Sequence, residues 1–154
     1  MINSEGIRFI DESHMDFYAE KVNVLKSNIF GKVSAPDVYL KSLIYTLGMC
    51  SDTRRRFDSI YDEKKRSINT GVISEAWQTG SSLKVTRLAF QLFTDSTPTA
   101  YVYDENDKVK ENISECEKYS VSDVFCCSYA PYFVEAIRLR YPEYLTRNEV
   151  GGNV

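Results

Sequence analysis

The segment from Trp77 to Phe93 constrains the fold most, because it joins the only tryptophan to the clearest helical periodicity in the chain. Its apolar residues at helical spacing fall on one stripe of a helix: Val85, Leu88, Ala89 and Leu92. We expect a core helix with Ser81 or Ser82 as its N-cap and Gly80 allowing a sharp entry. The rest of the chain is expected to pack around this helix.

Capping residues and prolines predict further helices on both sides of that segment. The region around Ala100–Lys110 allows either a small hairpin or a loop and helix to Cys116, and the sequence leaves both open. The expected helices run from Asp11 or Ser13 to about Lys26, from Ser34–Asp37 to Leu47 with Gly48 ending it, from a Ser51 or Asp52 cap through Thr53 to about Asp62, over Val72–Gln78, from Ser120 or Ser122 through Cys127, and from Pro131 to Tyr141.

The fold class that follows is mainly α: a compact helical bundle of five to seven helices, with room for one small β-hairpin. A chain of 154 residues with 43% hydrophobic residues is long enough to bury one core. We expect residues 1–145 to form a single globular domain. The Gly-rich end, residues 146–154, is expected to be a disordered tail.

Cysteine and histidine usage argues against a metal site or another cofactor. The four cysteines, Cys50, Cys116, Cys126 and Cys127, include no CxxC pair, and one histidine is available to complete a zinc site. The sequence also shows no signal peptide and no apolar run long enough to span a bilayer. We therefore expect free thiols, a cytoplasmic location and no membrane partner.

Charge is divided along the chain more sharply than the net value of −3 indicates. That net value argues against direct nucleic-acid binding over a wide surface. The acidic stretch is interpreted either as a solvated face or as a surface that imitates nucleic-acid charge and occupies a basic groove. The basic cluster contains Arg54, Arg55, Arg56, Lys64, Lys65 and Arg66, and the acidic stretch contains Asp104, Glu105, Asp107, Glu111, Glu115 and Glu117.

Three residues have side chains suited to catalysis, and none is predicted to be catalytic. His14 lies among carboxylates that would orient a general base, but helix-start acids and a capping histidine explain the same residues. Cys126 and Cys127 would serve as nucleophiles, but between aromatic residues they are more typical of small buried hydrophobes. We expect a protein without enzymatic activity.

A helix N-terminus at Thr79–Lys84 is the best candidate for a small ligand. Backbone amides and the helix dipole favour a phosphate there, and the residues that would hold it are Gly80, Ser81, Ser82, Lys84 and Arg87. The spacing is not that of a Walker loop. Ordinary capping explains the pattern better than a phosphate site does, and a binder or enzyme for a nucleotide or second messenger is the alternative function.

Several short blocks of the sequence carry a resemblance to known proteins. The blocks are Leu43–Gly48, Asp52–Arg54, Trp77–Gly80, Val85–Phe90 with Leu92 and Phe93, Tyr129–Phe133 and Leu139–Pro142. Together they resemble an uncharacterised family of small proteins from Gram-positive bacteria and their phages and mobile elements. The resemblance spans about Phe9–Tyr144 and carries no assigned activity or site residues. It implies a setting in which small acidic proteins block host defence machinery, including CRISPR effectors.

The predicted function is therefore inhibition by protein–protein binding, with a nucleic-acid-binding host defence effector as the partner. The predicted partner-binding residues are the acidic stretch together with Arg54, Arg55 and Arg56. The eleven tyrosines leave a homodimer open.

Overall fold

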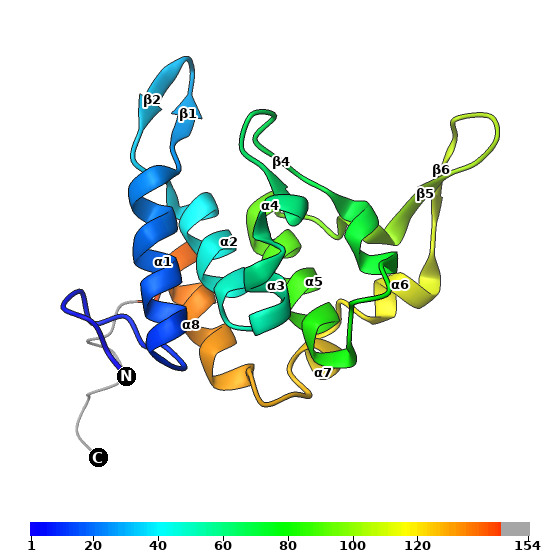
Figure 1. The fold of residues 1–154 in the computed structure, drawn as a ribbon. Coiled ribbons are helices and arrows are strands. Elements are labelled where there is room, and N and C mark those ends of the chain that lie inside the picture. The colour runs from blue at the N-terminus through cyan, green and yellow to red at the C-terminus, as the bar shows by residue number, and fades with distance from the viewer. Residues whose placement is uncertain (146–154) are drawn as a thin grey trace.

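A computed structural model describes residues 1–145 as a helical body from which three hairpins project (Figure 1). The described residues contain eight α-helices and two 3-10 helices, so the predicted mainly α class is confirmed. The expected tail, residues 146–154, lies outside the described part. The helices are α1 (Glu12–Val24), α2 (Val38–Gly48), α3 (Ser51–Arg55), α4 (Phe57–Ile60), η1 (Thr70–Ser74), α5 (Gly80–Thr94), η2 (Pro98–Ala100), α6 (Ile113–Glu117), α7 (Val121–Val124) and α8 (Ala130–Arg140).

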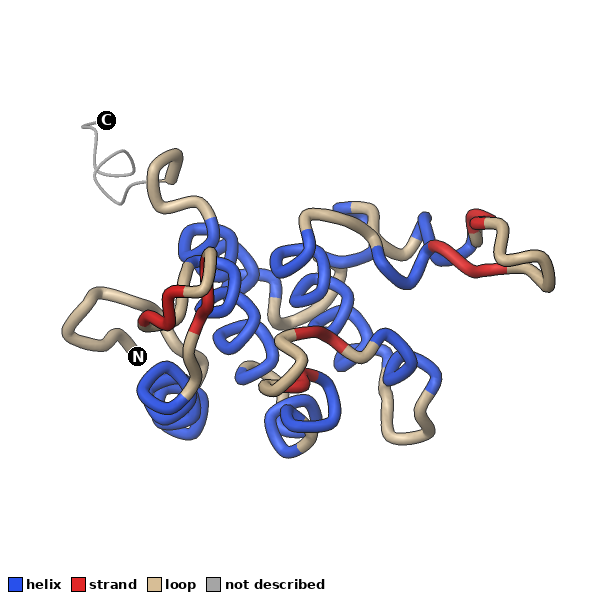
Figure 2. Tube along the Cα trace, turned by 90° about the horizontal axis from the view of Figure 1, so that it is seen from above, coloured by secondary structure: helices blue, strands red, loops and turns tan. Residues whose placement is uncertain are grey.

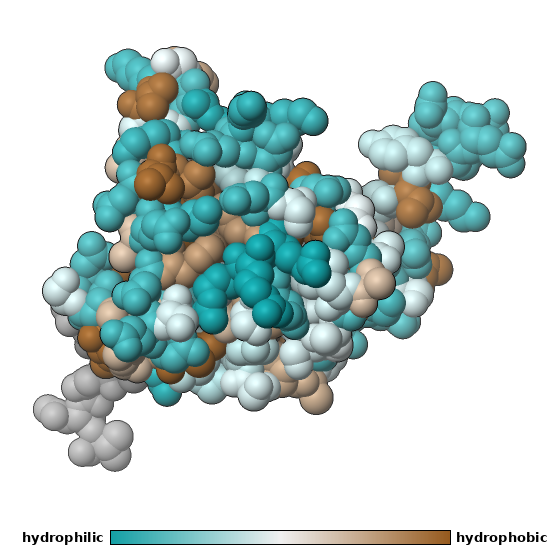
Figure 3. Space-filling view, viewed as in Figure 1, coloured by the Kyte–Doolittle hydropathy of each residue, from teal (hydrophilic) through white to brown (hydrophobic). Residues whose placement is uncertain are grey.

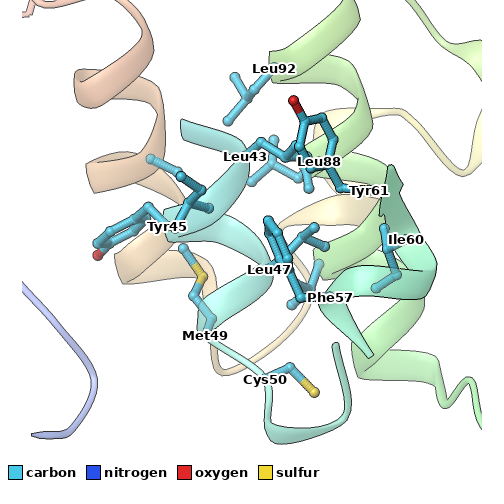
Figure 4. Close-up of a cluster of buried hydrophobic side chains, with 14 of the residues drawn as sticks. Leu43, Tyr45, Leu47, Met49, Cys50, Phe57, Ile60, Tyr61, Leu88 and Leu92 are labelled. Atoms are coloured by element: carbon cyan, nitrogen blue, oxygen red, sulfur yellow. The ribbon is translucent and has the colours of Figure 1, made fainter. Parts of the chain in front are cut away.

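Helix α2 forms the centre of the core, because it packs against α1, α5 and α8. Its Leu43, Ile44 and Leu47 side chains are fully buried, and Figure 4 shows side chains of α2 and α5 gathered in one apolar cluster. The stripe predicted on α5 is confirmed, since all four of its residues are buried. The tryptophan is not central: Trp77 precedes α5 and is only partly buried.

The start of α5 differs from the prediction by a few residues. Thr79, not Ser81 or Ser82, is the N-cap, and its hydroxyl accepts a hydrogen bond from the Ser82 amide at 3.1 Å. The Ser82 hydroxyl in turn accepts from the Thr79 amide at 2.7 Å, which completes a capping box. Serine fills the place that glutamate or glutamine usually takes, which is why the pattern was missed.

The predicted helix over residues 53–62 is interrupted. Arg56, with φ −111° and ψ 17°, leaves the helical region between α3 and α4. This break lets Phe57 and Ile60 both reach the core. The cap is Cys50 without a side-chain bond, in place of Ser51 or Asp52. The short helix expected over residues 72–78 is the 3-10 helix η1, which ends before Trp77.

Other predicted boundaries are partly confirmed. Asp11 caps α1, Ser120 caps α7, and Pro131 lies in the first turn of α8. Helix α2 starts later than Ser34, because Asp37 is its cap, and Gly48 lies inside it. Within residues 1–145 no helix combines the length and apolar character needed to cross a membrane.

Three separate antiparallel hairpins leave the helical body, and they spread along it from β1–β2 at one end to β5–β6 at the other (Figures 1 and 2). The predicted hairpin near residues 100–110 is confirmed, and α6 follows it, so both alternatives for residues 100–117 hold in part. The other two hairpins were not predicted. The strands are β1 (Ser27–Ile29) with β2 (Lys32–Ser34), β3 (Tyr61–Asp62) with β4 (Ser67–Ile68), and β5 (Tyr101–Tyr103) with β6 (Val109–Glu111).

Candidate partner-binding surface

The acidic hairpin, residues 101–111, is exposed at every position and stands away from the body (Figure 3). The Asp104 carboxylate shapes its turn by accepting hydrogen bonds from the Asn106 amide at 2.8 Å and the Lys108 amide at 3.0 Å. Asp107 occupies a left-handed conformation with φ +57°, which completes the turn. Glu105, Asp107 and Glu111 therefore lie on a projecting element, as the predicted acidic surface requires.

Apolar side chains accompany these acids on the same hairpin. Tyr103 is 72% exposed and Val109 is 59% exposed, and the two residues pair across the strands. Cross-strand pairs of this kind stabilise a hairpin only modestly. An exposed two-stranded hairpin is marginal on its own, so the body beneath it must hold its ends.

A buried polar network lies under the hairpin and holds those ends. Arg87 of α5 donates to both carboxylate oxygens of Glu115 in α6, at 2.7 and 3.1 Å. The Thr99 hydroxyl, just before β5, donates to the same carboxylate at 3.0 Å, and Tyr119 bonds Thr99 at 2.6 Å. The network thereby ties the segments before β5 and after β6 to α5.

This network corrects the predicted position of Glu115. Glu115 was assigned to the acidic surface, but it is only 8% exposed and faces inward, because the Arg87 guanidinium compensates its buried charge. Burial alone would raise the pKa of Glu115, but hydrogen bonds from Arg87, Thr99 and Lys118 outweigh it and hold the pKa below its ordinary value. Glu117, two residues further along α6, is exposed.

The groups expected to hold a phosphate at Thr79–Lys84 are engaged within the protein. Ser82 belongs to the capping box and also donates to Gln78 at 2.6 Å. Lys84 donates to the Asp123 carbonyl and lies 3.3 Å from its carboxylate. Arg87 is committed to Glu115. Gly80 and Ser81 are exposed, but no observation favours an anion there.

The three consecutive arginines have separate local partners. Arg54 donates to the Gly48 carbonyl at 2.7 Å and so satisfies the end of α2. Arg55 pairs with Asp52 at 2.5 Å, which supplies the acid that the first turn of α3 needs. The Arg56 guanidinium lies over the Trp77 ring at 5.1 Å. Arg54 and Arg56 therefore have structural roles that a partner-binding assignment alone does not describe.

His14 is fully buried, so the capping or exposed position expected for it is wrong. Its Nε2 lies 2.8 Å from the Tyr45 carbonyl, and its Nδ1 accepts from the Ile10 amide at 3.4 Å. Both ring nitrogens are thus used by a neutral imidazole protonated at Nε2. Burial lowers the pKa of His14 to about 4, against the opposing effect of the Tyr45 carbonyl. A buried ring without a free nitrogen has no route to a substrate.

The two candidate nucleophiles, Cys126 and Cys127, form no dyad with His14. Cys126 is exposed, and the Cys127 thiol contacts the Val124 carbonyl at 3.6 Å. The predicted placement as small buried hydrophobes is wrong for Cys126, whereas Cys127 is partly buried and packs against the core. In residues 1–145 no three His, Cys, Asp or Glu side chains are placed to hold a metal ion.

An apolar groove of about 570 Å³ lies between α5, α7 and α8. Leu88, Val124 and Ile137 contribute to its lining, and Arg140 and Asp95 lie at its polar side. Those two residues bond each other through both carboxylate oxygens at 2.8 Å. The groove thus offers an apolar surface whose charged groups already have partners.

The β1–β2 hairpin exposes aromatic and aliphatic side chains that the sequence reading missed. Phe30 at its turn is fully exposed, and Val33 is 65% exposed. The only sequence signal was the Phe-Gly dipeptide between short polar and apolar runs, which lacks the Asn or Asp typical of such turns.

Comparison with known proteins gives one match. No curated protein and no solved structure matches the chain. The model of the Family of unknown function (DUF6075) matches residues 4–152, nearly the whole chain. This agrees with the resemblance to an uncharacterised family, whereas the source in Gram-positive bacteria and phages stays a prediction. The chain therefore belongs to this family of unknown function.

Proposed function

We propose that the protein acts by binding another protein, and that the acidic hairpin is the contact element. The observation that carries this proposal is the placement of Asp104, Glu105, Asp107 and Glu111 on a projecting, fully exposed hairpin whose ends are fixed to the core. Glu117 extends the acidic surface onto α6, whereas Glu115 is excluded from it by burial.

Charge complementarity supports a partner with a basic groove. The hairpin carries four carboxylates against two lysines, and such groups steer a positively charged surface during encounter. The exposed Tyr103 adds an aromatic ring of the kind enriched at the centre of interfaces. A hairpin fixed at both ends also loses little conformational freedom on binding.

A nucleic-acid-binding protein is the class of partner whose groove fits these charges. Its phosphate-binding arginines and lysines would meet carboxylates in place of phosphates. The resemblance to proteins of phages and mobile elements extends this proposal to a host defence effector, with inhibition of that effector as the outcome.

The test immobilises three forms of the tagged protein and measures how much of each purified host nucleic-acid-targeting effector each form retains. The first is the wild type, and the second neutralises the hairpin through Asp104→Asn, Glu105→Gln, Asp107→Asn and Glu111→Gln. The third is a matched control with Lys64→Ser, Lys65→Ser and Arg66→Ser, which changes an exposed turn of opposite sign. Arg54 and Arg56 are left intact because they support the fold.

We expect the wild type and the basic-turn control to retain an effector that the neutralised hairpin loses. Added DNA should compete, and association should slow as salt rises, because screening shortens the reach of the carboxylates. If the neutralised hairpin variant still retains the effector, or if only the basic-turn control loses it, the interface lies elsewhere on the protein.

A further inference from the structure

The β1–β2 hairpin, at the end of the molecule opposite the acidic hairpin, and the β3–β4 hairpin beside it carry a different chemistry. All three hairpins rise from the same side of the body, with β3–β4 between β1–β2 and the acidic hairpin (Figure 1), and β1–β2 and β3–β4 both border one depression of about 240 Å³. Lys26 and Arg66 line this depression together with Ser27 and Asn28. These two hairpins are called the basic end below.

Phe30 occupies an unusual position at the tip of the basic end. Its side chain is fully exposed, and its backbone has φ +51°, followed by Gly31 with φ +78°. A left-handed conformation is uncommon for a bulky residue and costs free energy, and hairpin turns of this kind favour Asn-Gly. Strain and full exposure of an aromatic ring coincide here. Such a residue is best explained by an apolar environment that the isolated protein lacks.

Positively charged side chains lie on both hairpins of the basic end. Residues 26–34 contain Lys26 and Lys32 and no acid. The turn of the β3–β4 hairpin adds Lys64, Lys65 and Arg66, all exposed, against the two acids Asp62 and Glu63. Among residues 1–145 only Lys65 of these five forms an ion pair, with Asp62 at 3.8 Å.

We propose that the basic end docks on an anionic phospholipid surface, with Phe30 entering the interface and a lipid phosphate held between Lys26 and Arg66. Aromatic rings favour the boundary between head groups and acyl chains, and lysine and arginine side chains reach back to the head groups. Exposed Ile29 and Val33 extend the apolar tip. The one carboxylate at the depression, Asp37, already accepts the Leu40 amide at 2.9 Å as the cap of α2.

A lipid surface fits these features better than a pocket on a protein. A single ring at a turn enters a bilayer interface without a shaped cavity, and the surrounding cations need only a diffuse negative charge. The sequence predicted no membrane partner because no apolar run is long enough to span a bilayer, and that criterion does not detect an apolar tip formed by Ile29, Phe30 and Val33. This proposal is independent of the acidic hairpin and its partner.

The test is cosedimentation of the purified chain with vesicles of equimolar phosphatidylcholine and phosphatidylserine, compared with phosphatidylcholine alone. We expect binding to the anionic vesicles. Phe30→Ser should weaken it about tenfold or more through lost apolar burial, and the triple change Lys64→Ser, Lys65→Ser, Arg66→Ser should weaken it by about fivefold per charge. Circular dichroism checks that each variant is folded.

Matched variants at the other end supply the control. Tyr103→Ser removes an exposed aromatic from the acidic hairpin, and it should leave vesicle binding unchanged. Tryptophan placed at the tip, as Phe30→Trp with Trp77→Phe, should shift its emission to the blue on anionic vesicles. Absence of wild-type binding, equal loss in Tyr103→Ser and Phe30→Ser, or an unshifted emission would overturn the proposal. Capture of a protein that depends on Phe30, without vesicle binding, would also overturn it.

Discussion

Replacing Glu115 by alanine should destabilise the protein far more than any other loss of an acid from the stretch 104–117. The Glu115 carboxylate accepts from Arg87, Thr99 and Lys118, and the Arg87 side chain is only 6% exposed. Glu115→Ala leaves that guanidinium buried without its counter-ion. Removing one partner of a buried ion pair costs about 3–5 kcal/mol.

Urea denaturation followed by circular dichroism measures this cost, and the exposed neighbour supplies the control. Glu117→Ala should change the free energy of unfolding by no more than about 0.5 kcal/mol, as surface substitutions usually do. At about 2–4 °C per kcal/mol for a chain of this size, Glu115→Ala should lower Tm by roughly 6–20 °C. The double change Arg87→Met with Glu115→Leu should recover much of the loss, because no charge is then left unpaired.

Two results would refute this reasoning. A cost below about 1 kcal/mol for Glu115→Ala would show that water reaches Arg87 and that the pair is not desolvated. A double variant less stable than Glu115→Ala would show that packing, and not charge compensation, sets the cost. Wild-type stability supplies a third check: since the folded pKa of Glu115 is depressed, its contribution is present above the ordinary pKa and is lost as pH falls through the folded value.

Three further predictions concern other sites. Gly48→Ala should destabilise the protein by about 1–3 kcal/mol, because a Cβ would lie 2.9 Å from both His14 and Phe17. Gly80→Ala, with open space around the added Cβ, should be near neutral. Equal urea midpoints for the two variants would contradict this. As the pH is lowered from 6.5 to about 4, the contribution of His14 should reduce the free energy of unfolding by about 1.4 kcal/mol per pH unit, because the unfolded chain binds a proton at His14 that the folded protein excludes. His14→Gln should flatten this slope in urea titrations. Phe30→Asn should raise stability by roughly 1 kcal/mol by relieving the left-handed turn, and a fall in Tm would show that the ring packs on the body.

The sequence predicted the parts of the fold that depend on local signals. The α5 stripe follows from spacing alone, and Asp11 and Ser120 act as caps whatever surrounds them. The prediction of one helix from Thr53 to about Asp62 was wrong, because the break at Arg56 allows Phe57 and Ile60 to be buried. That burial depends on tertiary packing, which the local sequence does not show. The β3–β4 hairpin was missed because strands of two residues carry no periodicity.

The sequence predicted the charge of the candidate site but not which of its charged side chains pair with one another. The acids from Asp104 to Glu111 form a run in the sequence, and they do lie together on a hairpin. Arg87 and Glu115 are 28 positions apart, so their pairing depends on how α6 packs on α5. One prediction placed Arg87 in an anion site and another placed Glu115 on the surface, whereas each residue satisfies the other. Pairs of this kind cannot be assigned from one sequence, because each charge looks solvated until its partner is known.

The segregation of charge constrains how the two proposed contacts combine. An anionic surface that attracts the basic end repels the carboxylates of Asp104, Glu105 and Asp107, which lie at the other end of the molecule (Figures 1 and 2). Over a Debye length of about 8 Å at physiological salt, this repulsion acts only on groups close to the lipid. All three hairpins rise from the same side of the body (Figure 1), so a protein docked through Phe30 must tilt toward its β1–β2 end to keep the acidic hairpin in the aqueous phase, and this tilt satisfies both signs of charge. The hairpin would then face a soluble partner while the basic end stays on the membrane.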